Sequence, residues 1–356
     1  MLESKKIFID TEYYVRKGLN FNFSTLVNFK ELCEEEELSN YTTSVVKQEV
    51  YQKIHDSVTN ALGIIKDFKR KRHILTSIDE DFNCSIFDII DKNDIYQKAT
   101  LPFDNFLEHC NTFIVDSTNV NSEDVLKLYF NQAPPFSEKK NKEFPDAISL
   151  LSLKSYLSEG EKLYVVSDDP DMTNFCQTDT QLISIESLEK ILDLYNQHEH
   201  NISQKIKEYM EHNNELIKEE IKNQFEDYEV YNNSSWEDSE VDEFTVLSIG
   251  IFEPNIIDIT DELCIVVFDT DIELEITVTG PDYNNSIYDK EDRKHYVFGT
   301  TTKTEYILKT FTIEMELSYE INNSTLENIE IDNIYINGAS SEIEVEIEEN
   351  SPYDYK

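Results

Sequence analysis

The first 195 residues alternate short apolar runs with segments of helical periodicity, and this alternation narrows the possible folds more than any other feature. Apolar residues recur every three or four positions across 50–68 and 144–157, which predicts two amphipathic helices. Strands that alternate with helices favour an α/β fold with a parallel sheet flanked by helices. The runs with the length and composition of strands are 7–9, 42–46, 112–115, 163–166 and 182–185.

The pattern changes after residue 195. Across 196–228, apolar residues recur mostly every four positions among polar ones, which predicts a single amphipathic helix that connects two domains. Residues 229–240 have the composition of a linker. From 241 to 350 apolar and polar residues largely alternate, which predicts an antiparallel, sandwich-like β-rich domain. We therefore expect an α/β domain over 1–195, followed by this helix, the linker and the β-rich domain.

The formal net charge of the chain is −42, from 73 acidic and 31 basic side chains. Residues 229–356 contain 31 of the acidic residues and only 6 of the basic ones, so this third carries −25. Such a surface repels phosphate, so net charge argues against a nucleic-acid-binding protein. Three roles for the acidic C-terminal domain remain open. The first is a scaffold for self-association, the second is binding of a basic partner, and the third is covering basic groups of the N-terminal domain.

Targeting and cross-linking signals are weak in this sequence. The longest apolar runs fall well short of the roughly 20 residues that a membrane span needs. The first apolar run has only about three residues, too few for a signal-peptide core. The five cysteines form no C-x-x-C pair and are odd in number, which disfavours a disulfide framework or a zinc site. We expect a cytoplasmic protein with reduced thiols.

Four acidic residues share one structural context in the predicted α/β domain. Asp10 ends the first predicted strand, Glu49 follows the second, and Asp169 follows the fourth. Asp146 lies in the first turn of the helix predicted over 144–157. Strand ends and helix starts meet at one edge of a parallel sheet, where four carboxylates would repel one another unless a cation neutralised them. Ligation by oxygen atoms alone favours Mg²⁺ or Mn²⁺.

These positions and their neighbours resemble the PIN domain family of nucleases, and especially its bacterial PIN-like subgroup with a K-E-F-P-D-A segment. The matching residues are Phe-Ile-Asp-Thr at 8–11, Glu49, Lys-Glu-Phe-Pro-Asp-Ala at 142–147, and Ser-Asp-Asp-Pro-Asp at 167–171. The resemblance covers about residues 5–190 and implies a Mg²⁺- or Mn²⁺-dependent endonuclease that cleaves RNA, less often DNA. We expect an endoribonuclease, either a toxin or an antiphage effector. A flap-type DNA nuclease and a non-enzymatic interaction protein with an inactive PIN-like fold are the alternatives.

The resemblance also assigns roles to residues. Asp10, Glu49, Asp146 and Asp169 would be the catalytic acids and metal ligands. Thr11 and Ser167 would assist them through hydroxyl hydrogen bonds. Three acids lie within four residues in the last motif, so the main ligand there stays open among Asp168, Asp169 and Asp171, with Asp169 the first choice.

Two groups of basic residues are candidates for contact with nucleic acid phosphates. One lies at the end of the helix predicted over 50–68, and the other directly precedes the Pro-Asp helix start. Neither group requires such a function. Cations are favoured at a helix C-terminus, which would explain the first group, and the second would be explained by a solvated loop. The two groups consist of Lys69, Arg70, Lys71 and Arg72, and of Lys139, Lys140 and Lys142.

Overall fold

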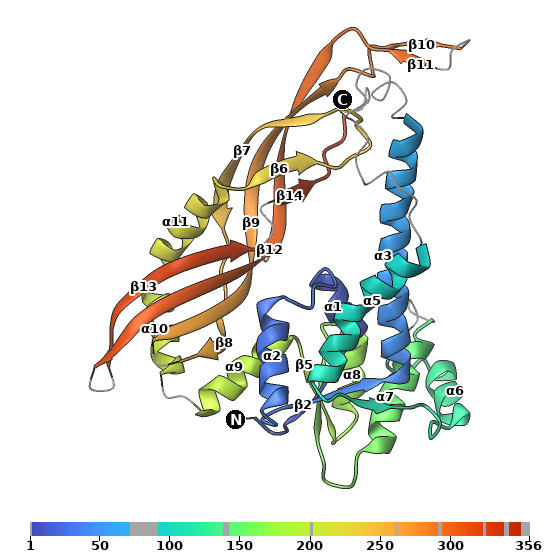
Figure 1. The fold of residues 1–356 in the computed structure, drawn as a ribbon, viewed down its shortest axis with the longest axis vertical. Coiled ribbons are helices and arrows are strands. Elements are labelled where there is room, and N and C mark those ends of the chain that lie inside the picture. The colour runs from blue at the N-terminus through green and yellow to red at the C-terminus, as the bar shows by residue number, and fades with distance from the viewer. Residues whose placement is uncertain are drawn as a thin grey trace. The chain divides into compact units, whose positions relative to one another are not determined.

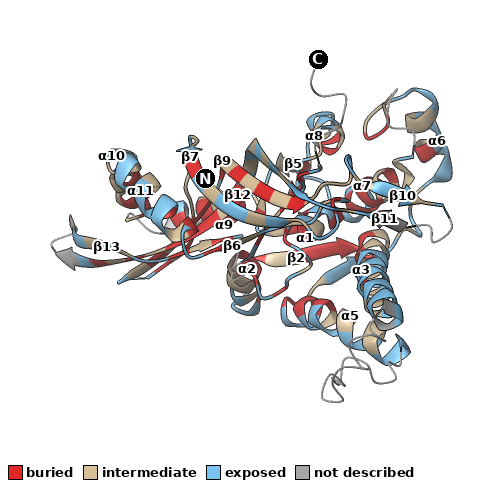
Figure 2. Ribbon diagram, turned by 90° about the horizontal axis from the view of Figure 1, so that it is seen from above, coloured by how far each residue is buried: buried red, intermediate tan, exposed pale blue. Residues whose placement is uncertain are grey.

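A computed structural model describes residues 2–71, 92–137, 142–199, 202–260, 262–290, 294–322, 325–337 and 342–349 (Figure 1). The chain divides into two compact units, residues 1–195 and 196–356. Within the described ranges, no helix combines the length and apolar character that crossing a lipid bilayer requires. Figure 2 shows buried residues along the strands of both units, while the distal part of the longest helix is exposed.

The N-terminal unit is built on a five-stranded sheet with the order β3-β2-β1-β4-β5, and every neighbouring pair is parallel. The parallel sheet predicted from the sequence is confirmed. Because the chain adds strands on one side of β1 and then crosses to the other, the topological switch point lies beyond the carboxyl ends of β1 and β4. The strands are β1 Lys6–Ile9, β2 Ser39–Thr43, β3 Phe113–Val115, β4 Leu163–Val166 and β5 Leu182–Ile185.

Helices flank this sheet (Figure 1). The longest, α3, packs against α5, where His55 stacks on Tyr96 with ring centroids 4.1 Å apart and the Thr59 and Tyr96 hydroxyls are 3.0 Å apart. α5 therefore supports α3 well beyond its first turns. The helices are α1 Thr11–Arg16, α2 Ser24–Glu34, α3 Ser44–Lys71, α5 Lys92–His109, α6 Ser122–Phe130, α7 Phe144–Tyr156, α8 Pro170–Gln177 and α9 Leu188–Glu199.

The second strand ends earlier than its composition predicts. Residues 42–46 were expected to be extended, but β2 ends at Thr43 and α3 begins at Ser44. The cause is local, because the Thr43 hydroxyl accepts the backbone N–H of Val46 at 3.1 Å and so caps the helix. Glu49 consequently lies in the second turn of α3 and not in a loop after a strand.

The C-terminal unit contains an antiparallel sheet with the order β13-β12-β9-β7, in which β8 also pairs with β9. The predicted antiparallel sheet is confirmed. Two small pairs accompany it, antiparallel β10–β11 and parallel β6–β14. The strands are β6 Glu229–Asn232, β7 Glu240–Ile249, β8 Asn255–Ile259, β9 Leu263–Pro281, β10 Ile287–Asp289, β11 Lys294–Tyr296, β12 Thr300–Asn322, β13 Thr325–Ile336 and β14 Glu342–Val345.

The segment between the predicted domains differs from the single helix expected there. It contains the end of α9 and two helices, α10 Ser203–His212 and α11 Asn214–Phe225. They separate at Asn213, whose φ of −105° and ψ of 20° are not helical, and whose backbone N–H and side-chain amide both donate to the Tyr209 carbonyl, at 3.0 and 2.9 Å. Both helices join the core of the sheet, where the Phe225 ring meets Phe311 edge-on at 5.2 Å.

The segment predicted as a linker is also structured. Its first residues form β6, and the Trp236 side chain is only 3% exposed. Trp236 donates its indole N–H to the Pro281 carbonyl at 2.8 Å, which anchors the segment to the end of β9. An aromatic ring that can bury its area and pair its N–H explains why this polar stretch is ordered.

Gly280 offers a test of this anchor. A Cβ atom there would lie 2.6 Å from Trp236 Cε2 and 2.7 Å from its Nε1. We expect Gly280→Ala to destabilise the protein by about 1–3 kcal/mol, because the ring has to move and its hydrogen bond is strained. Urea unfolding followed by Trp236 fluorescence measures this, since the chain has a single tryptophan. A Gly299→Ala variant, where no atom lies within 4 Å of the added Cβ and φ is not positive, is the control for an added methyl group without a clash.

Candidate active site

A cleft with a volume of about 860 Å³ lies at the carboxyl ends of β1 and β4, at the switch point of the parallel sheet. The starts of α1, α7 and α8 and one face of α3 contribute its walls. All four acids predicted as the core of the site line it. The lining consists of Asp10, Thr11, Glu12, Glu49, Gln52, Lys53, Asp56, Lys142, Glu143, Pro145, Asp146, Asp168, Asp169 and Pro170.

Asp10 is held at the junction of β1 and α1. Its backbone N–H donates to the Val166 carbonyl at 3.1 Å, which extends the β1–β4 pairing by one residue. Its carboxylate caps α1 by accepting the Thr11 N–H at 2.8 Å, and it accepts the Ser167 hydroxyl at 3.2 Å. Burial raises the pKa of Asp10 to about 6, and the charges of Glu49 and Glu12 add to this, although both hydrogen bonds act in the opposite direction.

Glu49 projects from α3 towards the start of α1, where the Thr11 hydroxyl donates to its Oε2 at 3.0 Å. Thr11 therefore links two of the predicted acids, because its N–H binds Asp10 and its hydroxyl binds Glu49. Burial raises the pKa of Glu49, and the charge of Glu143 adds to the increase, while Thr11 and Lys53 oppose it. Thr11 was expected to assist the acids through hydroxyl hydrogen bonds, and its hydroxyl does bond to Glu49.

Asp146 lies in the first turn of α7, directly after Pro145, which occupies a position where its missing N–H costs no helical hydrogen bond. The pKa of Asp146 is raised to about 8, mainly by burial. A hydrogen bond with Glu143 and the negative charges of Asp10, Glu143 and Glu49 raise it further. Three other carboxylates are thus close enough to act on Asp146. This convergence is what the order of the acids along the chain predicts.

The last motif places its three acids in different surroundings. Asp169 caps α8 by accepting the Asp171 N–H at 2.8 Å, and its own N–H donates to the Ser167 hydroxyl at 3.2 Å. The Asp168 carboxylate accepts Nη1 of Arg16 at 2.7 Å. Asp168 and Asp169 line the cleft, whereas Asp171 is not among its lining residues. Ser167 connects Asp10 to Asp169, in keeping with its expected assisting role.

Of the predicted phosphate-binding residues, Lys142 lines the cleft and is exposed. Arg70 lies near the far end of α3, where it pairs with Asp67 at 3.3 Å, and it is not a lining residue. Lys139, Lys140 and Arg72 lie outside the described residues, as do the side chains of Lys69 and Lys71.

Sequence reasoning missed five polar residues of this cleft. Three of them, Gln52, Lys53 and Asp56, follow Glu49 on α3 at spacings of three, four and seven residues, so they lie on the same helical face. That spacing was the available signal, and it was hidden because Glu49 was expected between a strand over 42–46 and a helix over 50–68, and not within the helix. Of the other two, Glu143 lies inside a recognised motif, 142–147, and Glu12 directly follows another, 8–11.

The donor set suits a hard divalent cation, although the side chains are not yet arranged around one. Eight acidic residues and two lysines line the cleft, and the pKa values of Asp10 and Asp146 rise to about 6 and about 8. A cation that takes oxygen ligands would relieve this repulsion. In the described part of the chain, no three Asp, Glu, His or Cys side chains already form such a group.

Comparison with known proteins agrees with the resemblance found in the motifs. Residues 7–172 match the sequence profile described as PIN domain, and this range contains the acids that line the cleft. Neither a curated protein sequence nor a solved structure matches the chain.

Proposed function

The N-terminal unit belongs to the PIN domain family, and from this premise we propose that the chain is a Mg²⁺- or Mn²⁺-dependent endoribonuclease. PIN domains are typically nucleases that use divalent metal ions, which implies a nucleic acid substrate. The observation that carries the proposal is that Asp10, Glu49, Asp146 and Asp169 all line one cleft at the switch point of the sheet. RNA is the proposed substrate because the sequence motifs resemble those of RNA-cleaving members of the family.

In this proposal the four acids hold the metal ion, and the remaining lining residues orient them or bind substrate. When bound, such an ion supplies Lewis-acid activation of water and neutralises charge that develops on the phosphate. Thr11 sets the positions of Asp10 and Glu49 relative to each other, and Ser167 does the same for Asp10 and Asp169. Lys53 and Lys142 also line the cleft, and in this proposal their flexible ammonium groups contact phosphates of the substrate.

The proposed function is tested with the full-length protein and labelled single-stranded RNA, single-stranded DNA and flap DNA, in Mg²⁺, in Mn²⁺ and in EDTA. We expect RNA cleavage that EDTA abolishes and that Asp146→Asn slows by about 10²-fold or more. Glu108→Gln is the control, because this exposed carboxylate on α5 does not line the cleft. Equal cleavage by all three proteins, or cleavage in EDTA, would refute the proposal. Cleavage of DNA alone would replace RNA by DNA as the substrate.

Lys53 and Lys142 are expected to affect substrate binding separately from the chemical step. We expect Lys53→Ala and Lys142→Ala each to raise KM severalfold with little change in kcat, because a phosphate contact made equally in the ground state and the transition state is lost. Each change should also reduce the slope of log affinity against log salt by about one. Lys98→Ala is the control, since Lys98 pairs with Asp94 on α5 and does not line the cleft. An unchanged salt slope in both variants would contradict this role.

A further inference from the structure

β13 is the outer strand of the antiparallel sheet and pairs with β12 along one side only. Asn337, directly after β13, donates its backbone N–H to the carbonyl of Thr312 in β12 at 2.8 Å, whereas Ile336 donates to the Tyr228 hydroxyl at 2.9 Å. Successive residues of a strand direct their backbone groups to opposite sides. By this alternation the backbone of Ile334 also points away from β12, towards the outer edge of the sheet.

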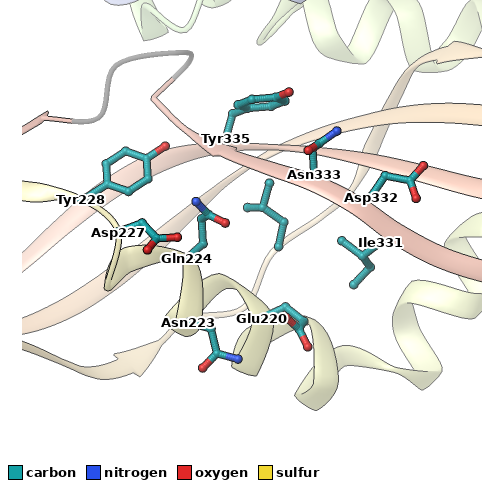
Figure 3. A pocket seen from close by; sticks show the side chains of 10 residues that line it. Glu220, Asn223, Gln224, Asp227, Tyr228, Ile331, Asp332, Asn333 and Tyr335 are labelled. Carbon is teal, nitrogen blue, oxygen red and sulfur yellow. The ribbon is translucent and has the colours of Figure 1, made fainter.

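A groove with a volume of about 470 Å³ runs beside this edge, between α11 and β13 (Figure 3). Five consecutive residues of β13, 331–335, line one side, so strand backbone forms part of that wall. Residues from the second half of α11 and the turn after it line the other side, among them Glu220, Gln224 and Asp227. The groove thus offers strand backbone on one side and long polar side chains on the other.

The charge of this groove restricts what can occupy it. Of the ten residues that line it, three are acidic and none is basic. The acids are Glu220 and Asp227 on the helical side and Asp332 on the strand. A nucleic acid backbone would be repelled here, and an extended chain with Lys or Arg side chains would be attracted.

β13 also opposes pairing with a second copy of itself. The register with β12 shifts between Asn333 and Ile331, which leaves Asp332 as an extra residue in a β-bulge. The acidic side chain at this edge hinders association between identical edges, because like charges would meet across the pair. A basic strand would meet opposite charges at the same positions.

We propose that this groove binds an extended basic segment of another protein, which adds to the sheet as a strand beside β13. The backbone of the segment pairs with the outward-facing groups at Ile334, and its cationic side chains reach Glu220 and Asp227. This interaction surface lies entirely within the C-terminal unit and is independent of the chemistry of the nuclease cleft.

The first test measures binding of a fluorescent ten-residue peptide, with alternating Lys and Val, to the full-length protein by fluorescence polarisation. We expect saturable binding, and none by the same peptide with Glu in place of Lys. The double variant Glu220→Lys, Asp227→Lys should bind at least about tenfold more weakly, a loss of about 1.4 kcal/mol. Its control is Glu219→Lys, Glu226→Lys, which makes the same charge change on the same segment at exposed positions outside the groove. Equal loss in both double variants would overturn the site.

The second test separates strand addition from simple charge attraction. Two forms of the peptide are N-methylated on alternate residues, so that one form loses the amide donors facing β13 and the other loses those facing away from it. Strand addition predicts that one form binds at least about tenfold more weakly than the other. Equal affinities of the two forms, no binding of the unmodified peptide, or release of a self-associated dimer when the peptide binds would each overturn the proposal.

Discussion

Asp10→Asn should slow cleavage by roughly 10²–10⁴-fold and should also raise the stability of the metal-free protein. Activity falls because an amide cannot replace a carboxylate as a charged ligand. The fold tolerates the change, since the amide oxygen still accepts the Thr11 N–H and the amide group can donate to the Ser167 hydroxyl. Stability increases because burial raises the pKa of Asp10 to about 6, so the fold disfavours the ionised form that prevails at neutral pH.

The gain in stability from Asp10→Asn depends on pH. The folded protein holds the Asp10 proton up to about pH 6, whereas an unfolded chain releases it near the ordinary aspartate pKa of 3.8. Between these values the folded state binds more protons, so stability falls as pH rises through this window and stays lower above it. Asn does not titrate, so Asp10→Asn should gain roughly 1–3 kcal/mol over wild type at pH near 8 and much less near pH 4.

Urea unfolding in EDTA at both pH values measures this difference, with Glu108→Gln as the control for loss of an exposed carboxylate. The same purified proteins are then assayed for cleavage in Mn²⁺. A variant that is less stable than wild type at the higher pH would show that the Asp10 carboxylate supports the fold. A variant that is as active as wild type would remove Asp10 from the site.

Lys17→Met should destabilise the protein by about 3–5 kcal/mol, because it leaves the charge of Glu189 buried without a partner. Lys17 Nζ lies 2.9 Å from Glu189 Oε1, and the two side chains are 4% and 6% exposed. Tyr13 donates its hydroxyl to the same carboxylate at 2.9 Å. Burial alone would raise the pKa of Glu189, but the pKa is lowered, because the charge and hydrogen bond of Lys17, together with the backbone N–H of Glu189 and the Tyr13 hydroxyl, outweigh burial. The pair joins the end of α1 to α9, and so supports the helix that Asp10 caps.

Two comparisons make this result specific. The double variant Lys17→Met, Glu189→Met should recover much of the lost stability, because it removes both buried charges and fills the space with apolar atoms. Lys98→Met removes an exposed pair, with Lys98 and Asp94 69% and 55% exposed, and should cost less than about 1 kcal/mol. A loss below about 1 kcal/mol for Lys17→Met, measured by urea unfolding at neutral pH, would contradict the proposed role of the pair.

Local sequence signals were sufficient for the parallel sheet and for α7, because short apolar runs and the Pro-Asp helix start are determined by neighbouring residues. They were insufficient at Thr43, where one hydroxyl hydrogen bond starts a helix among β-branched residues that favour strands. That single boundary hid the cleft-lining face of α3, with Gln52, Lys53 and Asp56.

Contacts between distant segments had no local signal at all. Lys17 and Glu189 are 172 positions apart in the sequence, and neither differs in its neighbourhood from a solvated charge. Asn213 likewise resembles any polar helix residue until its amide binds the Tyr209 carbonyl. In both cases tertiary packing decides the outcome, which periodicity and composition do not describe.

The length of α3 determines the distance between the cleft and the basic residues at the far end of the helix. Glu49 lies near its start and Arg70 near its end, 21 residues apart, which corresponds to about 32 Å along a helix axis. A stacked strand, with the rise of about 3.4 Å per nucleotide that it has in a duplex, spans roughly nine nucleotides between the cleft and the exposed basic residues Lys66 and Arg70. Shorter oligonucleotides reach only one end, so the affinity for substrate should increase with length up to this size and then level off.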